Sequence, residues 1–307
     1  MKRFLCHSFV FLTILGGMLV GACFFLHDAT AVNTMLGEQR DKLDQLAALQ
    51  GERVIIVGGS GSGQGFVTSN LCAAIKCPVY NMGLHAGLGL IYQMKSVEPR
   101  VRKGDTVLLI PEYANFDGSS CFGDAELLMM VCDIIPEHKA LLTLKHWVRL
   151  LTLMPKYGAD KFRHLFMPKR VKRGRIFDSL GDFIYPANLQ PMAQIVFPDA
   201  EVKKERDFSP NVVYAIQEFV DSTRAIGANV YLFPPAFKRL SFTRQKKYIE
   251  RIEEELRKSG LPFAASAERY ALEDKYFYDT PYHLNLEGRR LRTNLMAEDI
   301  QRIKFAE

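Results

Sequence analysis

The residues of this chain best suited to catalysis lie in two short segments far apart in the sequence. Ser60 lies on a glycine-rich turn (residues 58–65) that directly follows a β-type run (residues 53–57). Asp279 and His283 lie near the other end of the chain, four positions apart. A serine hydroxyl becomes a nucleophile when a histidine takes its proton and a carboxylate orients that histidine. The sequence therefore predicts acyl transfer through Ser60, His283 and Asp279.

The glycine-rich turn has two other common uses, and its sequence fits neither. A dinucleotide site needs the spacing Gly-x-Gly-x-x-Gly and usually an acidic residue after the second strand, which here ends at Asn81. A triphosphate-binding loop needs a lysine after its last glycine, and none follows here. We expect no nucleotide cofactor, and no metal, because no Cys or His group has zinc-site spacing. A flexible turn with incidental serines is the plain alternative.

Strands and helices alternate along most of the chain. Strands are expected at 53–57, 78–81, 106–110 and 229–233, and helices at 66–75, 87–96, 210–226, 243–259 and 286–304. Continuous Val/Ile-rich strands that alternate with helices predict an α/β fold with a parallel sheet covered on both faces. The carboxyl ends of such strands share one crevice, so Gly83, just after the second strand, is expected beside the turn of Ser60.

The first residues predict a membrane anchor. Lys2 and Arg3 precede an uncharged stretch at 8–26, and its nineteen residues would rise about 28 Å as a helix, the thickness of a bilayer core. The flanking charges place the rest of the chain outside the cytoplasmic (inner) membrane, in a periplasmic or other extracytoplasmic space. A signal peptide cleaved near residues 29–31 is the alternative.

We divide the chain into an anchor or signal peptide (1–31), a helical stalk (32–50) and one α/β domain (51–307). The strand–helix rhythm breaks at about 121–209, which predicts a helical insertion there. Hydrophobic residues make up 48% and charged residues 24% of the 307 residues, so wholesale disorder is excluded. No nucleic acid partner is expected outside the membrane.

The insertion contains the most basic part of the chain. Residues 156–175 include eight Lys or Arg residues and only one acidic residue, and the net charge of the whole chain is +6. This segment is expected either to contact anionic lipid headgroups or an acidic polymer, or to be a solvated surface. Leu144, Trp147, Val148 and Leu151 recur at helical spacing just before it and are predicted to be core residues.

The order of the motifs resembles the SGNH (GDSL-type) hydrolase superfamily. Gly-Gly-Ser (58–60) follows the first strand, Asn-x-Gly (81–83) follows the second, and Asp-Thr-x-Tyr-His-Leu-Asn (279–285) lies near the C-terminus. The chain is similar, more narrowly, to a membrane-anchored branch that includes the D-alanyl transfer protein of lipoteichoic acid modification and the alginate acetylation proteins. The resemblance covers about residues 52–120 and 210–300. It implies a three-layer α/β/α sandwich (SGNH/flavodoxin-like) and ester hydrolysis or acyl transfer on carbohydrate.

The resemblance also implies roles for individual residues. Ser60 matches the nucleophile, His283 the base, and Asp279 the acid that orients the base. The backbone amides of Ser60 and Gly83 match two donors of an oxyanion hole, which stabilises the negative oxygen of the tetrahedral intermediate. Asn115 is the candidate for the third donor.

The sequence departs from the family pattern in three places, which leaves alternatives open. The acid before the nucleophile is missing, the third block Gly-x-Asn-Asp is replaced by residues 110–115, and three residues separate Asp279 from His283 where two are commoner. Ser62 is a second candidate for the hydroxyl, although Ser60 comes first after the strand, as the family's nucleophile does. Asp279 is also a candidate for a simple cap of the turn before Pro281.

Two functions fit these residues. The first is a serine esterase or O-acyltransferase acting on acyl esters, foremost acetyl esters, of cell-envelope polysaccharide. By family analogy its partners would be the acylated polymer, the membrane and a membrane-embedded acyltransferase. The second is a catalytically inactive protein of the same fold that assembles or binds carbohydrate in an envelope polysaccharide pathway. The retained Ser, Asp and His favour the first function, and the altered third block favours the second.

Four cysteines follow the anchor, in a compartment expected to be oxidising. Cys72 and Cys77 are close in sequence at the end of a predicted helix, and Cys121 and Cys132 form the matching pair. Two disulfides are possible, with three connectivities. One of them pairs Cys72 with Cys77, which requires the helix to end before Cys77, and Cys121 with Cys132.

Overall fold

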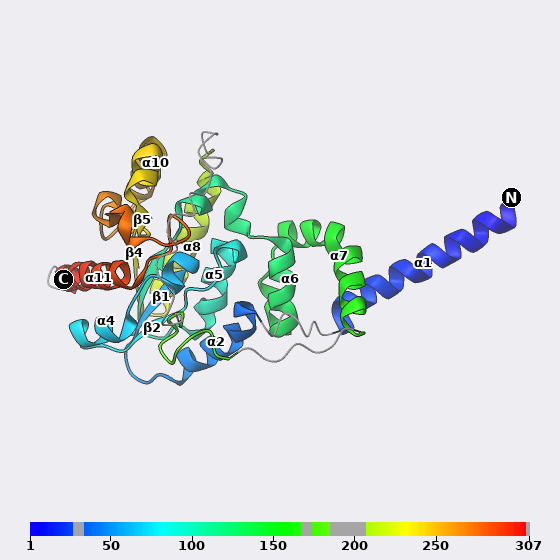
Figure 1. Cartoon of the computed structure of the whole chain (residues 1–307), viewed down its shortest axis with the longest axis horizontal. Coiled ribbons are helices and arrows are strands. Elements are labelled where there is room, and N and C mark those ends of the chain that lie inside the picture. The colour runs from blue at the N-terminus through cyan, green and yellow to red at the C-terminus, as the bar shows by residue number, and fades with distance from the viewer. Residues whose placement is uncertain (27–33, 167–173, 185–206, 305–307) are drawn as a thin grey trace. The chain divides into compact units, whose positions relative to one another are not determined.

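The structure is a computed structural model, and it describes residues 1–26, 34–166, 174–184 and 207–304. The chain divides into two compact units. Residues 41–123 and 175–307 make up one, which we call the α/β unit, and residues 1–40 and 124–174 make up the other, which we call the helical unit. Figure 1 follows the chain from blue to red.

Four parallel strands form the sheet of the α/β unit in the order β2-β1-β3-β4. They are β1 (Val54–Gly58), β2 (Val79–Asn81), β3 (Thr106–Ile110) and β4 (Asn229–Leu232). The register pairs Ile56 with Asn81 on one side and with Leu108 on the other. Beyond β4, Leu232 forms one further parallel bridge with Phe263. The predicted strands and the parallel sheet are confirmed.

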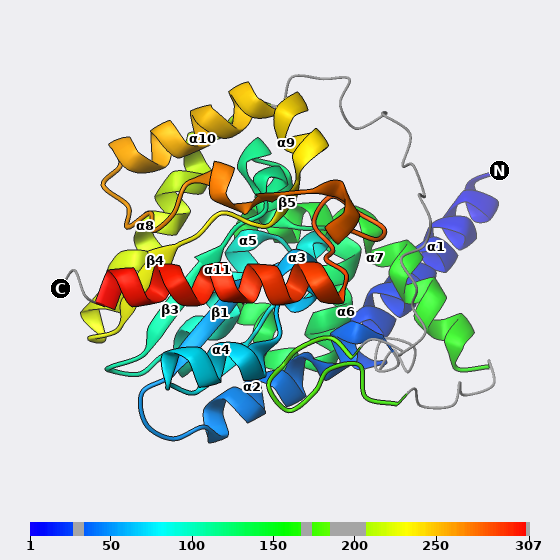
Figure 2. The same cartoon turned by 60° about the vertical axis from the view of Figure 1, so that its left-hand side comes forward.

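Helices cover both faces of the sheet, as the continuous hydrophobic strands require. On one face lie α4 (Thr68–Ile75) and α11 (Leu286–Lys304), which contact each other. Side chains alternate along a strand, so β1 also buries its other face, which α5 (Leu90–Val97) contacts, while α8 (Pro210–Ala225) contacts β4. Figure 2 shows α11 crossing in front of the strands with α5 behind them.

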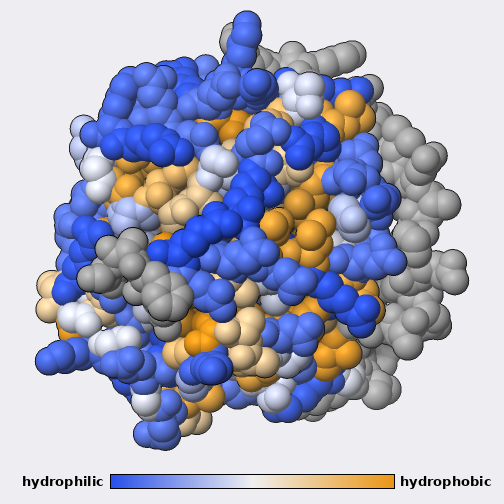
Figure 3. All heavy atoms as spheres, turned by 90° about the vertical axis from the view of Figure 1, so that its left-hand side faces the viewer, coloured by the Kyte–Doolittle hydropathy of each residue, from blue (hydrophilic) through white to orange (hydrophobic). Residues whose placement is uncertain are grey.

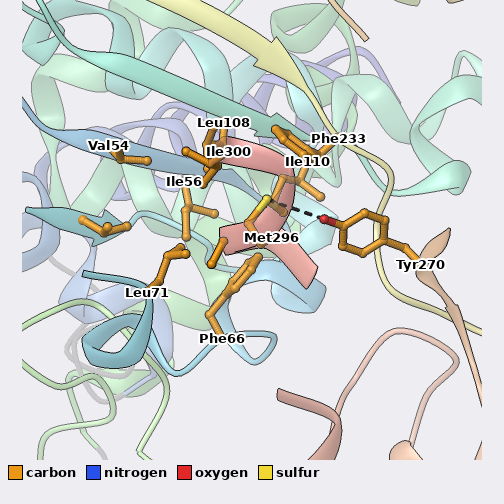
Figure 4. Close-up of a cluster of buried hydrophobic side chains, with 12 residues drawn as sticks. Val54, Ile56, Phe66, Leu71, Leu108, Ile110, Phe233, Tyr270, Met296 and Ile300 are labelled. Carbon is orange, nitrogen blue, oxygen red and sulfur yellow. Dashed lines mark hydrogen bonds between the residues drawn. The ribbon is translucent and has the colours of Figure 1, made fainter. Parts of the chain in front are cut away.

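The core of the first face contains side chains from both helices and three strands (Figure 4). Its central members are Val54, Ile56, Phe66, Leu71, Leu108, Ile110, Met296 and Ile300. The hydroxyl of Tyr270 lies 3.8 Å from the sulfur of Met296 at the edge of this cluster. This packing fixes α11, and with it the segment that contains His283, against the sheet.

Shorter elements complete the α/β unit. They are α2 (Gln39–Ala48), α3 (Ser60–Gly63), α9 (Arg239–Arg244), α10 (Lys246–Lys258), and a two-stranded parallel sheet of β5 (Phe237–Lys238) and β6 (Ala271–Leu272). From Asp41 onward, α2 belongs to this unit, because Leu43 and Leu46 are buried and the Leu46 carbonyl accepts a hydrogen bond from Arg53 Nη1. Part of the segment expected as a helical stalk (32–50) thus packs on the α/β unit.

Arg53 and Asp105 form a fully buried ion pair beneath the starts of β1 and β3. Arg53 Nε donates to Asp105 Oδ1 at 3.0 Å, and its Nη2 donates to the Arg100 carbonyl at 2.9 Å. A buried charge pair is tolerated only when its remaining donors and acceptors are satisfied. The pair therefore holds the amino-terminal ends of two adjacent strands.

The helical unit contains α1 (Lys2–Phe25), a 3-10 turn (Met35–Glu38), α6 (Ala125–Ile134), a second 3-10 turn (Pro136–Leu141) and α7 (Leu144–His164). By length and composition, α1 is apolar enough to cross a membrane, and most of its residues are exposed. The C-terminal part of α1 packs against α7 (Figure 1). The proposed cleavage site at residues 29–31 lies outside the described residues.

The interpretation of four α7 residues as core is wrong. Leu144, Val148 and Leu151 are 80%, 56% and 61% exposed, and Trp147 is half-buried. Their spacing does place them on one face of a helix, but no described part of the protein covers that face. Most of the basic segment beyond α7 (167–173) lies outside the described residues.

Cys72, Cys77, Cys121 and Cys132 are free thiols, so the possibility of disulfides among them is corrected. Cys72 lies within α4, and its sulfur instead accepts a hydrogen bond from the Val79 backbone at 3.3 Å. Cys77 lies beyond the end of α4 beside the Glu52 carbonyl. Cys121 and Cys132 are both buried.

The side of the molecule at which the C-terminus lies has a mixed surface. Figure 3 shows its hydrophobic residues in separate patches among hydrophilic ones. Apolar atoms make up much of any folded protein's accessible surface, so such scattered patches need no partner.

Candidate active site

The site lies at the carboxyl ends of the strands, at the point where the order of the sheet reverses. The chain leaves the central strand β1 at Gly58 and enters α3 at Ser60, while its two neighbours, β2 and β3, connect in opposite directions from it. Parallel sheets leave a crevice at such a switch point. The fold therefore places the glycine-rich turn where a ligand has access.

Ser60, His283 and Asp279 form a hydrogen-bonded chain. Ser60 Oγ lies 2.9 Å from His283 Nε2, and His283 Nδ1 lies 2.8 Å from Asp279 Oδ1. A carboxylate only accepts, so Nδ1 carries the proton and Nε2 is left to accept from the serine hydroxyl. The structure thus brings together the three residues that the sequence singled out, from segments separated by 223 positions.

The loop that contains the histidine is held by its own hydrogen bonds. Thr280 Oγ1 accepts from the backbone N–H groups of Tyr282 and His283 at 3.3 and 3.1 Å. Tyr278 stacks its ring on the imidazole at 5.7 Å between centroids. Thr280 rather than Asp279 therefore caps this turn, which leaves the Asp279 carboxylate for the histidine.

Exposure separates the two candidate serines. Ser60 is half-buried, and the side chains of His283 and Asp279 are 14% and 31% exposed. Ser62 is 2% exposed, and its hydroxyl lies below the turn near Gly58. A substrate can therefore reach Ser60 but not Ser62.

The Gly83 amide departs from its predicted role as an oxyanion donor. Its N–H donates to Asn81 Oδ1 at 2.9 Å, which engages it inside the protein. Gly83 instead packs back to back with Gly63, since a Cβ on Gly83 would lie 2.2 Å from the Gly63 nitrogen. The close approach of these two backbones explains both glycines.

Asn115 and the Ser60 amide remain as candidate oxyanion donors. Asn115 Oδ1 accepts from the Glu112 backbone N–H at 2.8 Å, which fixes the orientation of its amide. Neither the Ser60 N–H nor Asn115 Nδ2 has a hydrogen-bond partner among residues 1–26, 34–166, 174–184 and 207–304. Asn115 is 3% exposed, in the 3-10 turn (Tyr113–Asp117) that follows β3.

Two ionisable residues that were not predicted from the sequence form hydrogen bonds with the turn after Ser60. The Gly61 N–H donates to Glu112 Oε1 at 3.0 Å, and the Gly61 carbonyl accepts from Arg292 Nη1 at 2.7 Å. Glu112 comes from the loop after β3, and Arg292 comes from α11. The N–H and the carbonyl of Gly61, which belong to two successive peptide groups, are thus each held by a side chain from a different element.

Both groups are deeply buried, and burial disfavours the charged form of each. Glu112 is 5% exposed, and burial raises the pKa of its carboxyl, against the opposing hydrogen bond from Gly61. Arg292 is 0% exposed, and burial lowers its pKa to about 10. Its guanidinium lies over the Phe66 ring at 4.2 Å, and its Nε and Nη2 atoms have no hydrogen-bond partner within the described ranges.

A polar network below the turn was also missed. Asn81 Nδ2 donates to the Ser62 carbonyl and to Asp182 Oδ1, both at 2.9 Å. Asp182 also accepts from the backbone and hydroxyl of Thr68, and burial raises the pKa of Asp182. Lys42, from α2, donates to the Gly83 carbonyl at 2.7 Å. An Asn at the end of the second strand was the one signal in the sequence that pointed to this network.

No metal site competes with this arrangement in the part of the chain that the structure describes. No group of three His, Cys, Asp or Glu side chains there is placed to hold a metal ion. A hollow lined by residues including Glu52, Cys77 and Asn229 lies at the amino-terminal ends of the strands, at the other edge of the sheet.

Comparisons with known proteins add little. No protein-family model matches the chain, and no curated protein matches its sequence. Among solved structures, the chain is similar to the crystal structure of the protein YxiM from Bacillus subtilis, with a TM-score of 0.41 and 14% sequence identity. The alignment covers 83% of this chain and 58% of that one, so the chain spans little more than half of that protein.

Proposed function

We propose that this chain is a membrane-anchored serine esterase or O-acyltransferase that uses Ser60, His283 and Asp279. The observation that carries the proposal is the pair of contacts at 2.9 and 2.8 Å that join the three side chains in order. Nucleophile, base and orienting acid in hydrogen-bond contact are the recurring signature of activated serines on unrelated folds. The SGNH-type motifs and the α/β fold support the same assignment.

In the first half of the reaction, Ser60 Oγ attacks the carbonyl carbon of an ester while its proton moves to His283 Nε2. Asp279 accepts the Nδ1 hydrogen bond throughout, which holds the ring and stabilises its positive charge. The oxyanion forms near the Ser60 N–H, with the Asn115 amide as second donor. When the carbon–oxygen bond of the leaving alcohol breaks, His283 returns the proton to that alcohol.

In the second half, the acyl group on Ser60 passes to an incoming hydroxyl. His283 takes the proton of that hydroxyl as it attacks, and the serine oxygen leaves with the proton. Water as the acceptor gives hydrolysis, and a sugar hydroxyl gives transfer. Both reactions use the same side chains and differ only in the acceptor.

For the substrate we propose acyl esters, foremost acetyl esters, of cell-envelope polysaccharide. Support comes from the likeness of the motifs to the membrane-anchored branch of the SGNH superfamily and from α1, which is long and apolar enough to span the cytoplasmic membrane. The catalytic unit would lie on the extracytoplasmic side, with a membrane-embedded acyltransferase as a partner.

One observation favours a second candidate, a non-catalytic assembly or carbohydrate-binding protein with the same fold. The Gly83 N–H donates inside the protein, which leaves the oxyanion site with fewer donors than the family pattern implies. A single lost donor lowers rates by about 10²–10³, so it weakens a site without removing the chemistry.

A fluorophosphonate probe separates the two candidates, because it reacts only with an activated serine. Labelling of the wild type and of Ser62→Ala, together with loss of labelling in Ser60→Ala and His283→Ala, is expected for the enzyme. Absence of labelling in a folded wild type would favour the non-catalytic candidate. If the wild type is labelled, it is then incubated with an acetylated oligosaccharide and the products are analysed by mass spectrometry. Free acetate indicates hydrolysis, and a newly acetylated sugar indicates transfer.

The contribution of Asn115 has a separate test. Asn115→Ala should lower the rate of ester cleavage by about 10²–10³ if its amide stabilises the oxyanion. An unchanged rate would remove it from the proposed oxyanion hole, with no effect on the assignment of Ser60.

A further inference from the structure

Helix α7 has three distinct faces, and one of them is apolar and exposed. Counted at about 100° a residue, Leu144, Val148, Leu151 and Phe162 of α7, together with Leu165 and Phe166 in the turn directly after it, fall within an arc of about 100°. All six are between 49% and 80% exposed. Pro155 lies inside the helix; counted by themselves, the three residues before it span about 60° and the three after it about 100°. We call these six residues the apolar face of α7.

The other two faces have different compositions. The buried face comprises His146, Leu150, Met154, Tyr157, Gly158 and Lys161. Four cations, Lys145, Arg149, Lys156 and Arg163, lie about 100–140° round the helix from Leu144. Only one acid, Asp160, occurs on α7. An apolar face flanked by cations is typical of helices that lie in the interface of a membrane.

The contacts with α1 fix how α7 is turned. Lys161 Nζ donates to the carbonyls of Cys23 and Leu26 at 2.8 and 2.7 Å, at the C-terminal end of α1. Gly158 lies deeper along α1, because a Cβ there would be 2.1 Å from the Leu19 carbonyl oxygen. Gly158 lies about 60° round α7 from Lys161. This direction of rotation leads toward the part of α1 that would lie inside the bilayer.

The apolar face lies further round in the same direction. Phe162 is about 40° beyond Gly158, and Phe166 is about 80° beyond it. Both are therefore on the side of α7 that faces along α1 toward its N-terminus. If α1 crosses the bilayer, this side meets the lipid surface at the depth where α1 emerges.

Buried contacts hold α7 firmly in that orientation. Lys161 is 1% exposed and pairs with Asp133 at 2.6 Å, and the Tyr157 hydroxyl donates to the same carboxylate at 2.7 Å. Cys23 Sγ donates to the Met154 carbonyl at 3.0 Å. A helix that is fixed to α6 by a buried ion pair, and to α1 by hydrogen bonds and a close backbone approach, cannot rotate its apolar face away.

We infer that α7 is an interfacial helix whose apolar face inserts into the outer leaflet of the bilayer that α1 spans. The occupant of this face is lipid rather than another protein, because the face continues from α1 at the depth of the interface. The inference rests on one part of the proposed function, the membrane span by α1, and is independent of the catalytic assignment.

Trp147 provides the test, since it is the chain's only tryptophan and adjoins the apolar face. The full chain is reconstituted in vesicles of phosphatidylcholine and phosphatidylglycerol, with phosphatidylcholine brominated at a shallow or a deep acyl position. An interfacial helix lies at the boundary between headgroups and acyl chains. Shallow bromines should therefore quench Trp147 more strongly than deep ones, and aqueous iodide should quench it weakly.

Two neighbouring variants supply the matched control. Leu151→Asp places a charge on the apolar face and should lose quenching by shallow bromines while gaining quenching by iodide. Thr152→Asp places the same charge outside the apolar face and should behave as the wild type.

Two outcomes would overturn the inference in distinguishable ways. Strong quenching by iodide and none by either brominated lipid, in a protein that resists alkaline carbonate extraction, would leave α1 as a span and refute the interfacial helix. Release of the protein by carbonate would refute the span itself and the interfacial helix with it. Labelling of Ser60 by the fluorophosphonate probe reports on catalysis in either case.

Discussion

Glu112→Gln tests whether the carboxyl that holds the Gly61 amide is protonated in the folded protein. The side chain accepts from the Gly61 N–H at 3.0 Å and caps the turn at Asn115, and it is 5% exposed. Glutamine has almost the same shape and keeps one acceptor oxygen, but its side-chain amide does not ionise. The comparison therefore isolates the pH dependence that the carboxyl contributes to stability.

The sign follows from the direction of the pKa shift. Burial raises the pKa of Glu112 above its usual value of 4.5, so the folded protein binds this proton more tightly than the unfolded chain does. The stabilisation is fully present below the unfolded pKa and is lost as pH rises through the folded pKa. Relative to Glu112→Gln, the wild type should lose up to about 1.4 kcal/mol for each pH unit between the unfolded value of 4.5 and the raised folded pKa.

Hydrogen exchange of backbone amides in β1 measures this difference in the full-length protein in detergent. The free energy of opening is compared for the wild type and Glu112→Gln across the interval above pH 4.5 in which the shift acts. Glu250→Gln, which changes a carboxylate on the exposed side of α10, should follow the wild type. A difference between wild type and Glu112→Gln that is constant, or that grows in favour of the wild type with rising pH, would refute the reasoning. Glu112 would then be ionised in the fold, with Gly61 and Arg292 outweighing burial.

Three further predictions concern the surrounding structure. Asp105→Ala leaves Arg53 as an unpaired buried cation and should lower the free energy of unfolding by about 3–5 kcal/mol, measured by the same exchange of β1 amides. Gly63→Ala places a Cβ 2.8 Å from the Gly83 carbonyl oxygen and should cost about 1–3 kcal/mol, with weaker probe labelling of Ser60; an unchanged variant would contradict the close packing of the two glycines. Burial raises the pKa of Cys132 to about 12, so its thiol should resist alkylation in the folded protein and react after unfolding, whereas a disulfide would block both.

The sequence predicted the sheet well because its strands are continuous hydrophobic runs. β1, β3 and β4 are bounded by turn residues, and a fully covered parallel sheet needs such runs. Ser60, Asp279 and His283 could be predicted because the triad chemistry leaves a pattern of residue types in short segments. Their juxtaposition follows from the shared crevice at the carboxyl ends of a parallel sheet, which the alternation of strands and helices predicts.

Glu112 and Arg292, which form hydrogen bonds with Gly61, could not be predicted, because their roles depend on neighbours distant in sequence. Arg292 lies among several charged residues of α11, and nothing local distinguishes it from those that face solvent. Gly83 matched a family motif, but its backbone N–H donates a hydrogen bond to the side chain of Asn81, two positions before it. For Leu144 and Leu151, helical spacing predicts a shared face but is silent on whether protein or lipid covers it.

The contact between Lys161 and the end of α1 makes α1 an integral part of the helical unit, whereas a simple targeting segment would have no such contact. If α1 were removed, or replaced by an arbitrary apolar helix, Lys161 would lose two carbonyl acceptors and Gly158 would face a void in place of the Leu19 backbone. A form of the protein without α1 would therefore need compensating changes in α6 and α7. The apolar helix α1 and the packing of the helical unit therefore depend on each other.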